Sequence, residues 1–192
     1  MPAVLDEVAR LVTVAPLSRK GRVFRLVAPD GDAIVAALRP ALDSQSFHAR
    51  FTVEIAVVTT PWLAWLRQSP DIRNPLPREG AVKAVLSTME CGPDEIAACA
   101  AEVSAMLARA LPEWLPLLDR SELWWRLRED GPLPGTCARV AVRAALAADA
   151  GDEPATRRDA DAIERLDPAS DFPDWVRAAI RNWPPPQDGD VK

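Results

Sequence analysis

The stretch FHARFTVEIAVVTT, residues 47–60, alternates apolar and polar side chains with a period of two. The apolar positions of this alternation are Phe47, Ala49, Phe51, Val53, Ile55 and Val57. The positions between them are His48, Arg50, Thr52, Glu54 and Ala56. A period of two is typical of a β-strand with one buried face and one polar face. The stretch therefore predicts the central strand of a small antiparallel sheet.

The segments around this stretch predict further strands. Residues 23–27 and 33–38 have strand character, and the turn signal Pro29-Asp30-Gly31 between them predicts a hairpin. Residues 81–89 are a fourth strand candidate. A helix is predicted before the sheet, at residues 3–14, because its apolar residues fall on one helical face.

The second half of the chain predicts helices. The clearest runs from residue 96 to residue 110, and we expect Pro112 and Pro116 to end it. Three more are predicted at residues 137–150, 154–166 and 172–182. In the second of these, the expected inward stripe is Ala160, Ile163 and Leu166.

Strands first and helices afterwards predict an α+β fold, in which an antiparallel sheet of about four strands is backed by helices. We expect a sheet-and-helix domain at residues 1–120 and a helical C-terminal extension packed on it at residues 121–185. The last residues, 186–192, are expected to be a disordered tail.

Composition excludes several classes of protein. The 192 residues are 48% apolar, which is typical of a globular chain. No apolar run approaches the length of a membrane span, and the acidic start MPAVLDEVAR is unlike a signal peptide, so we expect a cytoplasmic protein with no membrane partner. Three scattered cysteines without CxxC spacing argue against a disulfide framework and a cysteine metal site.

The charge distribution does not favour nucleic acid as a partner. Residues 1–92 carry 11 Lys and Arg against 9 Asp and Glu, and residues 93–192 carry 12 against 19. Neither half has the basic excess of a nucleic-acid binder. The strongest basic cluster is Arg19, Lys20, Arg22 and Arg25. It fits either a solvated turn beside an edge strand or a binding patch.

The order of helix, LSRKGRVF, hairpin and FTVEIAV resembles the bacterial domain-of-unknown-function family DUF 4304, over roughly residues 3–120. The matching positions are Arg19, Lys20, Gly21, Arg22, Phe24, Phe51, Val53 and Ile55. The chain departs from the family pattern at Pro16 and Leu17, at Leu38 and Arg39, and at Glu54, where the family usually has asparagine. The resemblance implies an antiparallel sheet backed by helices, and it implies no established chemistry.

The polar residues of the 47–60 strand are the main candidates for chemistry. His48 is the only histidine of the chain, and with Glu54 it has the residue types of an acid–base pair. On a strand the two lie six residues apart, about 20 Å, so they cannot touch. The alternative interpretation is a solvated face with cross-strand ion pairs.

Other catalytic and cofactor-binding patterns are missing from the sequence. There is no GxSxG elbow and no phosphate-binding glycine loop, and a single histidine makes a histidine-based metal site improbable. We therefore expect no catalytic residues, no metal and no cofactor.

Seven tryptophans and no tyrosine are an unusual aromatic composition, and some of the tryptophans are candidates for a binding surface. Thr60 and Pro61 predict a helix start, with Thr60 as the cap and the indoles of Trp62 and Trp65 on one side. Exposed tryptophan is a common binding anchor, while core packing is the commoner fate. One indole of each close pair, this one and the adjacent pair at 124–125, is expected to be partly exposed.

Two functions are the main hypotheses at this point, beside a third, a nucleic-acid binder that uses Arg19 to Arg25. One is a non-catalytic protein-interaction module, of an immunity-like or accessory kind, whose partner is another protein. The other is a small-molecule binder or unconventional enzyme that uses the polar face of the 47–58 strand. The candidate binding residues are His48, Arg50, Glu54, Arg39, Trp62, Trp65, Arg19 and Arg22.

Overall fold

The computed structural model describes residues 2–41, 48–67, 80–129, 136–166 and 172–181. The chain divides into two compact units. The first contains residues 1–58 and 76–119, and the second contains residues 59–75 and 120–192. The expected tail at 186–192 lies outside the described residues. So do residues 69–79 of the proline-rich stretch 69–80, which the sequence predicts to be an exposed loop.

The first unit is built on a five-stranded sheet whose strands follow one another in sequence order, each antiparallel to the next. The strands are β1 (Ser18–Lys20), β2 (Val23–Val27), β3 (Ala33–Pro40), β4 (Ala49–Val58) and β5 (Val82–Cys91). The predicted α+β class is confirmed. The sheet has one strand more than expected, because β1 folds back on β2 through Gly21, whose φ of 62° suits glycine.

The alternation in residues 47–60 is confirmed in β4. Phe51, Val53 and Ile55 are fully buried, whereas the side chains between them are partly exposed. β4 lies between β3 and β5, so it is an inner strand, and the middle strand of the five is β3.

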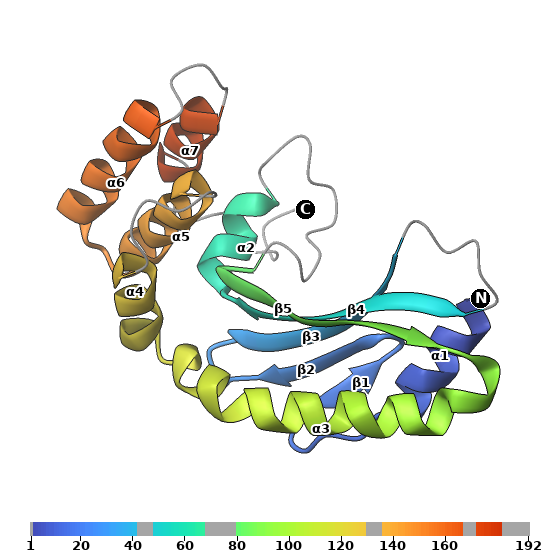
Figure 1. Cartoon of the computed structure of the whole chain (residues 1–192). Coiled ribbons are helices and arrows are strands. Elements are labelled where there is room, and N and C mark those ends of the chain that lie inside the picture. The colour runs from blue at the N-terminus through green and yellow to red at the C-terminus, as the bar shows by residue number, and fades with distance from the viewer. Residues whose placement is uncertain (1, 42–47, 68–79, 130–135, 167–171, 182–192) are drawn as a thin grey trace, which may run out of the picture. The chain divides into compact units, whose positions relative to one another are not determined.

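Two helices cover the buried face of the sheet. Helix α1 (Pro2–Leu11) packs against β3 and β4, and α3 (Ile96–Trp114) packs against β5 and α1. Figure 1 shows α3 running along the sheet. A short 3-10 turn, η2 (Pro93–Glu95), precedes α3, and a second, η3 (Leu115–Leu118), follows it. We call this face the helix-packed face.

The expectation that Pro112 ends α3 is wrong, because the helix continues to Trp114. Proline removes one backbone hydrogen bond from a helix, and this loss is local. Leu111 and Trp114, on either side of Pro112, are at least nine-tenths buried. Their burial keeps the last turn of the helix in place against the cost of the proline.

The second unit is a group of helices arranged around α5 (Thr136–Asp149). Helix α5 packs against each of the others: α2 (Thr60–Leu66), α4 (Arg120–Glu129), α6 (Glu153–Leu166) and α7 (Phe172–Arg181). Its buried residues include Ala141, Ala144 and Ala145, each fully buried. Such small side chains let neighbouring helices approach α5 closely.

Three details of the second unit differ from the expectations. Helix α2 is preceded by Thr59 as its cap residue, without a side-chain cap hydrogen bond, so Thr60 is the first helical residue. Leu166 is 48% exposed, since it closes α6 at a point beyond the buried stripe that Ala160 and Ile163 form. Trp62 and Trp65 are both buried, so neither indole of this pair is an exposed anchor.

Gly80 marks a close approach of two backbones in the first unit. A Cβ added there would lie 2.7 Å from Ala56 Cβ and 2.7 Å from the carbonyl oxygen of Val57. The next residue, Ala81, donates its backbone N–H to that same oxygen. The side chain of alanine therefore has no room at position 80.

We expect the substitution Gly80→Ala to lower the free energy of unfolding by about 1–3 kcal/mol, the usual cost of overpacking. Urea unfolding followed by tryptophan fluorescence measures the change. Lys83→Ala, on an exposed side chain of β5 three residues further along the chain, is the matched control and should stay within about 0.5 kcal/mol of the wild type. Equal stability of the Gly80→Ala variant and the wild type would contradict the close approach.

Candidate functional site

The face of the sheet opposite the helix-packed face carries the predicted site residues, and we call it the polar face. On this face, the pairing of neighbouring strands places side chains next to one another in rows that run across the sheet. One row is Arg25, Val35, Ala56 and Lys83, from β2 to β5. The next row is Lys20, Val23, Ala37, Glu54 and Val85, from β1 to β5.

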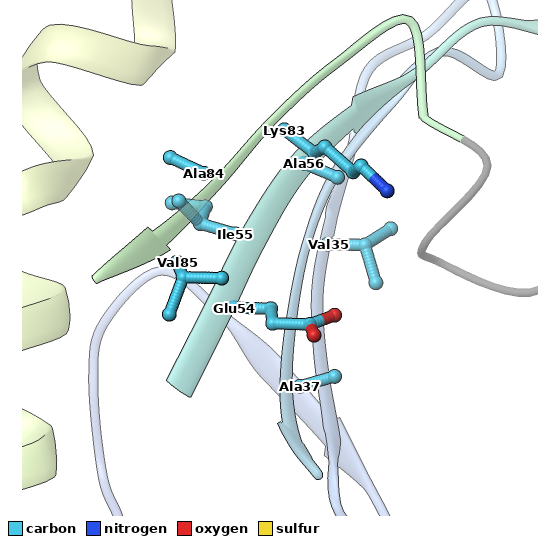
Figure 2. Close-up of a pocket in the computed structure, with 8 residues that line it drawn as sticks. All are labelled: Val35, Ala37, Glu54, Ile55, Ala56, Lys83, Ala84 and Val85. Atoms are coloured by element: carbon cyan, nitrogen blue, oxygen red, sulfur yellow. The ribbon is translucent and has the colours of Figure 1, made fainter. Parts of the chain in front are cut away.

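A pocket of about 130 Å³ lies where these two rows cross β3, β4 and β5. The residues that line it are Val35, Ala37, Glu54, Ile55, Ala56, Lys83, Ala84 and Val85. Figure 2 shows Glu54 and Lys83 reaching from β4 and β5 toward the side of Val35. The pocket therefore has apolar walls and two ionisable side chains, a carboxylate and an ammonium group.

Cross-strand ion pairs are present on the polar face, as one interpretation of the sequence expected. Arg39 of β3 pairs with Glu54 of β4, and both side chains are about a quarter exposed. Arg50 lies 3.8 Å from Glu90 of β5, in a more exposed pair. The carboxylate of Glu54 is thus already paired with a guanidinium group of the neighbouring strand.

Basic side chains outnumber acidic ones on the polar face. Its basic residues are Lys20, Arg25, Arg39, Arg50 and Lys83, and its acidic ones are Glu54 and Glu90. Within the described ranges, Lys20, Arg25 and Lys83 form no ion pair. All three are exposed. The face is therefore positively charged around its apolar centre.

The four residues of the predicted basic cluster do not lie together on one face of the sheet. Arg19 and Lys20 are neighbours on β1, so they point to opposite faces of the sheet. The Nη1 of Arg19 donates to the carbonyl oxygen of Gly21, at 3.2 Å. Arg22 donates to Asp6 of α1 at 2.5 Å, and this hydrogen bond lowers the pKa of the Asp6 carboxyl. Only Lys20 and Arg25 belong to the polar face.

The other predicted site residues lie away from the pocket. His48 is exposed and lies beside Gly92, where an added Cβ would come within 3.2 Å of the imidazole. Trp62 and Trp65 are buried in α2, which belongs to the second unit. Of the eight predicted binding residues, Glu54 lines the pocket and Arg39 pairs with it.

Sequence reasoning missed the partners that β3 and β5 contribute. Val35 and Ala37 look like ordinary core residues of a hairpin strand, and Lys83 looks like one polar residue in an ambiguous strand. Because every second residue of a strand lies on the same face, their positions along β3 and β5 were a usable signal for the face of the sheet that they occupy. The register that places Lys83 next to Ala56 depends on the pairing of β4 with β5, which local patterns do not specify.

The described residues show no group of His, Cys, Asp and Glu able to hold a metal ion. They also include no helix long and apolar enough to cross a membrane.

All three cysteines lie in described segments, and none forms a disulfide. Burial, a hydrogen bond with Cys99 and the nearby charges of Cys99 and Glu95 raise the pKa of the Cys91 thiol to about 12, so this thiol is a poor nucleophile.

The raised pKa of Cys91 makes stability depend on pH in the alkaline range. The thiol ionises near pH 9 in the unfolded chain but only near pH 12 in the folded protein. The contribution of this difference to the free energy of unfolding is therefore complete below about pH 9 and is lost as the pH rises toward 12. We expect the free energy of unfolding to fall by at most about 1.4 kcal/mol per pH unit on this account.

Urea unfolding at several values between about pH 8 and pH 11 measures this slope. The Cys91→Ala variant is less stable at every pH, because it leaves a cavity, but it should lose less stability per pH unit than the wild type. Parallel pH profiles of the two proteins would show that Cys91 does not carry the effect.

No protein-family model matches the chain, and neither a curated protein nor a solved structure matches it. The resemblance to DUF 4304 accordingly stays a prediction.

Proposed function

We propose that this protein is a non-catalytic interaction module whose polar face binds an acidic segment of another protein. The observation that carries the proposal is the pocket at Glu54 and Lys83, at the centre of a face with excess positive charge. An immunity-like or accessory role fits such a module, because both act by holding a partner.

The size of the pocket favours a side chain of a protein partner over a free small molecule. Its volume of about 130 Å³ is well below the roughly 300–1,000 Å³ of common small-molecule sites. Val85 stands at its rim with 61% of its surface exposed. An apolar side chain from a partner would bury this surface and fill the space between Val35 and Ala56.

The charge of the polar face supports an acidic partner. Arg25 and Lys83 stand at the two ends of the row that contains Val35 and Ala56, about 14 Å apart at ordinary strand spacing. Two basic groups on either side of an apolar centre complement a segment that carries an apolar residue flanked by carboxylates. The polar-face rows contain no aromatic side chain, which disfavours single-stranded nucleic acid as the partner.

A second candidate function rests on the same pocket. Its apolar walls beside Glu54 are the arrangement that a small-molecule binder on this face requires. The space would admit only a compound of a few heavy atoms. Binding of such a compound would be insensitive to Arg25, which does not line the pocket.

The proposal is tested by site-specific photo-crosslinking in cells that naturally make the protein. A photoreactive amino acid replaces Val85, and in a separate protein it replaces Leu11, which is 38% exposed at the end of α1. We expect position 85 to capture a protein that position 11 does not capture. The captured region should be acidic when its peptides are sequenced.

Charge-reversal variants supply the controls for the crosslinking experiment. Lys83→Glu and Arg25→Glu should each reduce capture at position 85 by about tenfold or more, since each places like charges against the acidic segment. Arg157→Glu, an exposed site on α6 of the second unit, changes the net charge equally and should leave capture unchanged. Capture of nucleic acid, equal capture at positions 85 and 11, or equal effects of the three variants would overturn the proposal.

A further inference from the structure

A second pocket lies in the helical unit, and its lining is unlike that of the sheet pocket. Its volume is about 390 Å³, and the described residues that line it are Trp124, Arg128, Arg143 and Arg158. Trp124 and Arg128 come from α4, Arg143 from α5 and Arg158 from α6. Three helices therefore bring three arginine side chains to one cavity, although residues 93–192 carry an excess of acidic residues.

A buried carboxylate holds one of these arginines and lies near a second. The side chain of Asp159 is 2% exposed, and it accepts two hydrogen bonds from Arg143, from Nε at 3.1 Å and from Nη2 at 2.6 Å. Arg158 Nε lies 3.8 Å from the same carboxylate. A guanidinium group has five N–H donors, so both arginines keep donors for a ligand.

The third arginine is oriented by aromatic rings. The guanidinium carbon of Arg128 lies 4.9 Å from the ring centre of Trp124 and 5.2 Å from that of Trp125. A cation placed over an aromatic face keeps the N–H groups at its edge available for hydrogen bonds. Among the described residues Arg128 forms no ion pair with a carboxylate.

The charges of the pocket do not balance within the described residues. The described lining has three arginines, and Asp159, which pairs with two of them, is the one carboxylate, so an excess of about two positive charges is left. A carboxylate ligand would neutralise one of them, whereas a diphosphate group carries enough charge for both. Arginine is also the residue whose planar donors match phosphate oxygens in pairs.

We propose that this pocket binds a small phosphorylated molecule through a diphosphate group. Arg143, which Asp159 holds in place, binds the phosphate oxygens together with Arg158 and Arg128. The volume of about 390 Å³ exceeds what the phosphates alone would fill and lies within the usual range for small-molecule sites. The partly exposed ring of Trp124 provides an aromatic wall for the rest of the molecule.

Isothermal titration calorimetry with inorganic pyrophosphate and with ADP, in buffer free of divalent metal ions, tests the proposal on the full chain. We expect both to bind, and we expect their affinity to fall as sodium chloride is raised. Tighter binding of ADP would mean that the pocket also holds the nucleoside. Equal binding would mean that it recognises the diphosphate alone.

Single substitutions separate this site from general positive charge. Arg128→Ala and Arg158→Ala remove exposed arginines and should each weaken pyrophosphate binding by about tenfold or more, the usual effect of losing a hydrogen bond between charged groups. Arg157→Ala, one residue away on α6 and paired with Glu153, is the matched control and should change the affinity by less than about twofold.

Two results would overturn the proposal. One is the absence of a binding signal from both pyrophosphate and ADP at millimolar concentration, with circular dichroism showing a folded protein. The other is equal weakening by Arg157→Ala and Arg158→Ala, which would show that the ligand senses only overall charge. The proposal does not depend on the function of the polar face, because its site residues all belong to the second unit.

Discussion

Phe51→Ala should lower the free energy of unfolding by about 3–5 kcal/mol, the usual cost of removing a large buried aromatic side chain. Phe51 is fully buried at the centre of the apolar face of β4, and its neighbours on that face, Val53 and Ile55, are fully buried too. The strands on either side of β4 hold its backbone in place. We therefore expect the cavity to remain largely open, which puts the effect toward the upper end of the range.

Thr52→Ala is the matched control, because Thr52 is the next residue of β4 and points to the polar face. It should change the stability by about 0.5 kcal/mol or less. Urea unfolding followed by circular dichroism measures both variants in a way that the loss of an aromatic fluorophore cannot distort. Similar losses at positions 51 and 52 would show that the two faces of β4 are not different, against the alternation and the observed burial.

The alternation in residues 47–60 predicts β4 and its buried face because a strand side chain can reach only two surroundings. Strand-forming residues and a turn signal also find β2 and β3, and β5 is found as a strand candidate although its pattern is ambiguous. Sequence patterns miss β1, since three residues are too few to show a period. The candidate site is less predictable, because it depends on which strands pair and in which register.

Tryptophans and arginines show the same limit in the helical unit. Trp62 and Trp65 have the spacing of a buried helix face, and this spacing cannot tell a core from a binding anchor. Arg128, Arg143 and Arg158 lie on three helices and share no local pattern. Only the packing of α4, α5 and α6 brings them together, and packing follows from the shape of many side chains at once.

Asp159→Ala should also destabilise the protein by about 3–5 kcal/mol, because it breaks a buried ion pair and leaves a charge behind. Arg143 is held by two hydrogen bonds to Asp159, and its own side chain is only 21% exposed. Without the carboxylate, the guanidinium group keeps the cost of its burial and loses the attraction that offsets it. The substitution also removes a link between α5 and α6.

A double substitution distinguishes this explanation from simple loss of contacts. Arg143→Met with Asp159→Leu removes both charges and keeps apolar volume, so it should recover most of the stability that Asp159→Ala loses. Asp161→Ala, on an exposed residue of the same helix, should stay within about 0.5 kcal/mol of the wild type. If the double variant is as unstable as Asp159→Ala, the ion pair itself stabilises the helical unit. If the double variant is at least as stable as the wild type, the pair costs at least as much as it contributes, and the positive charge of the pocket has been kept for a reason other than stability.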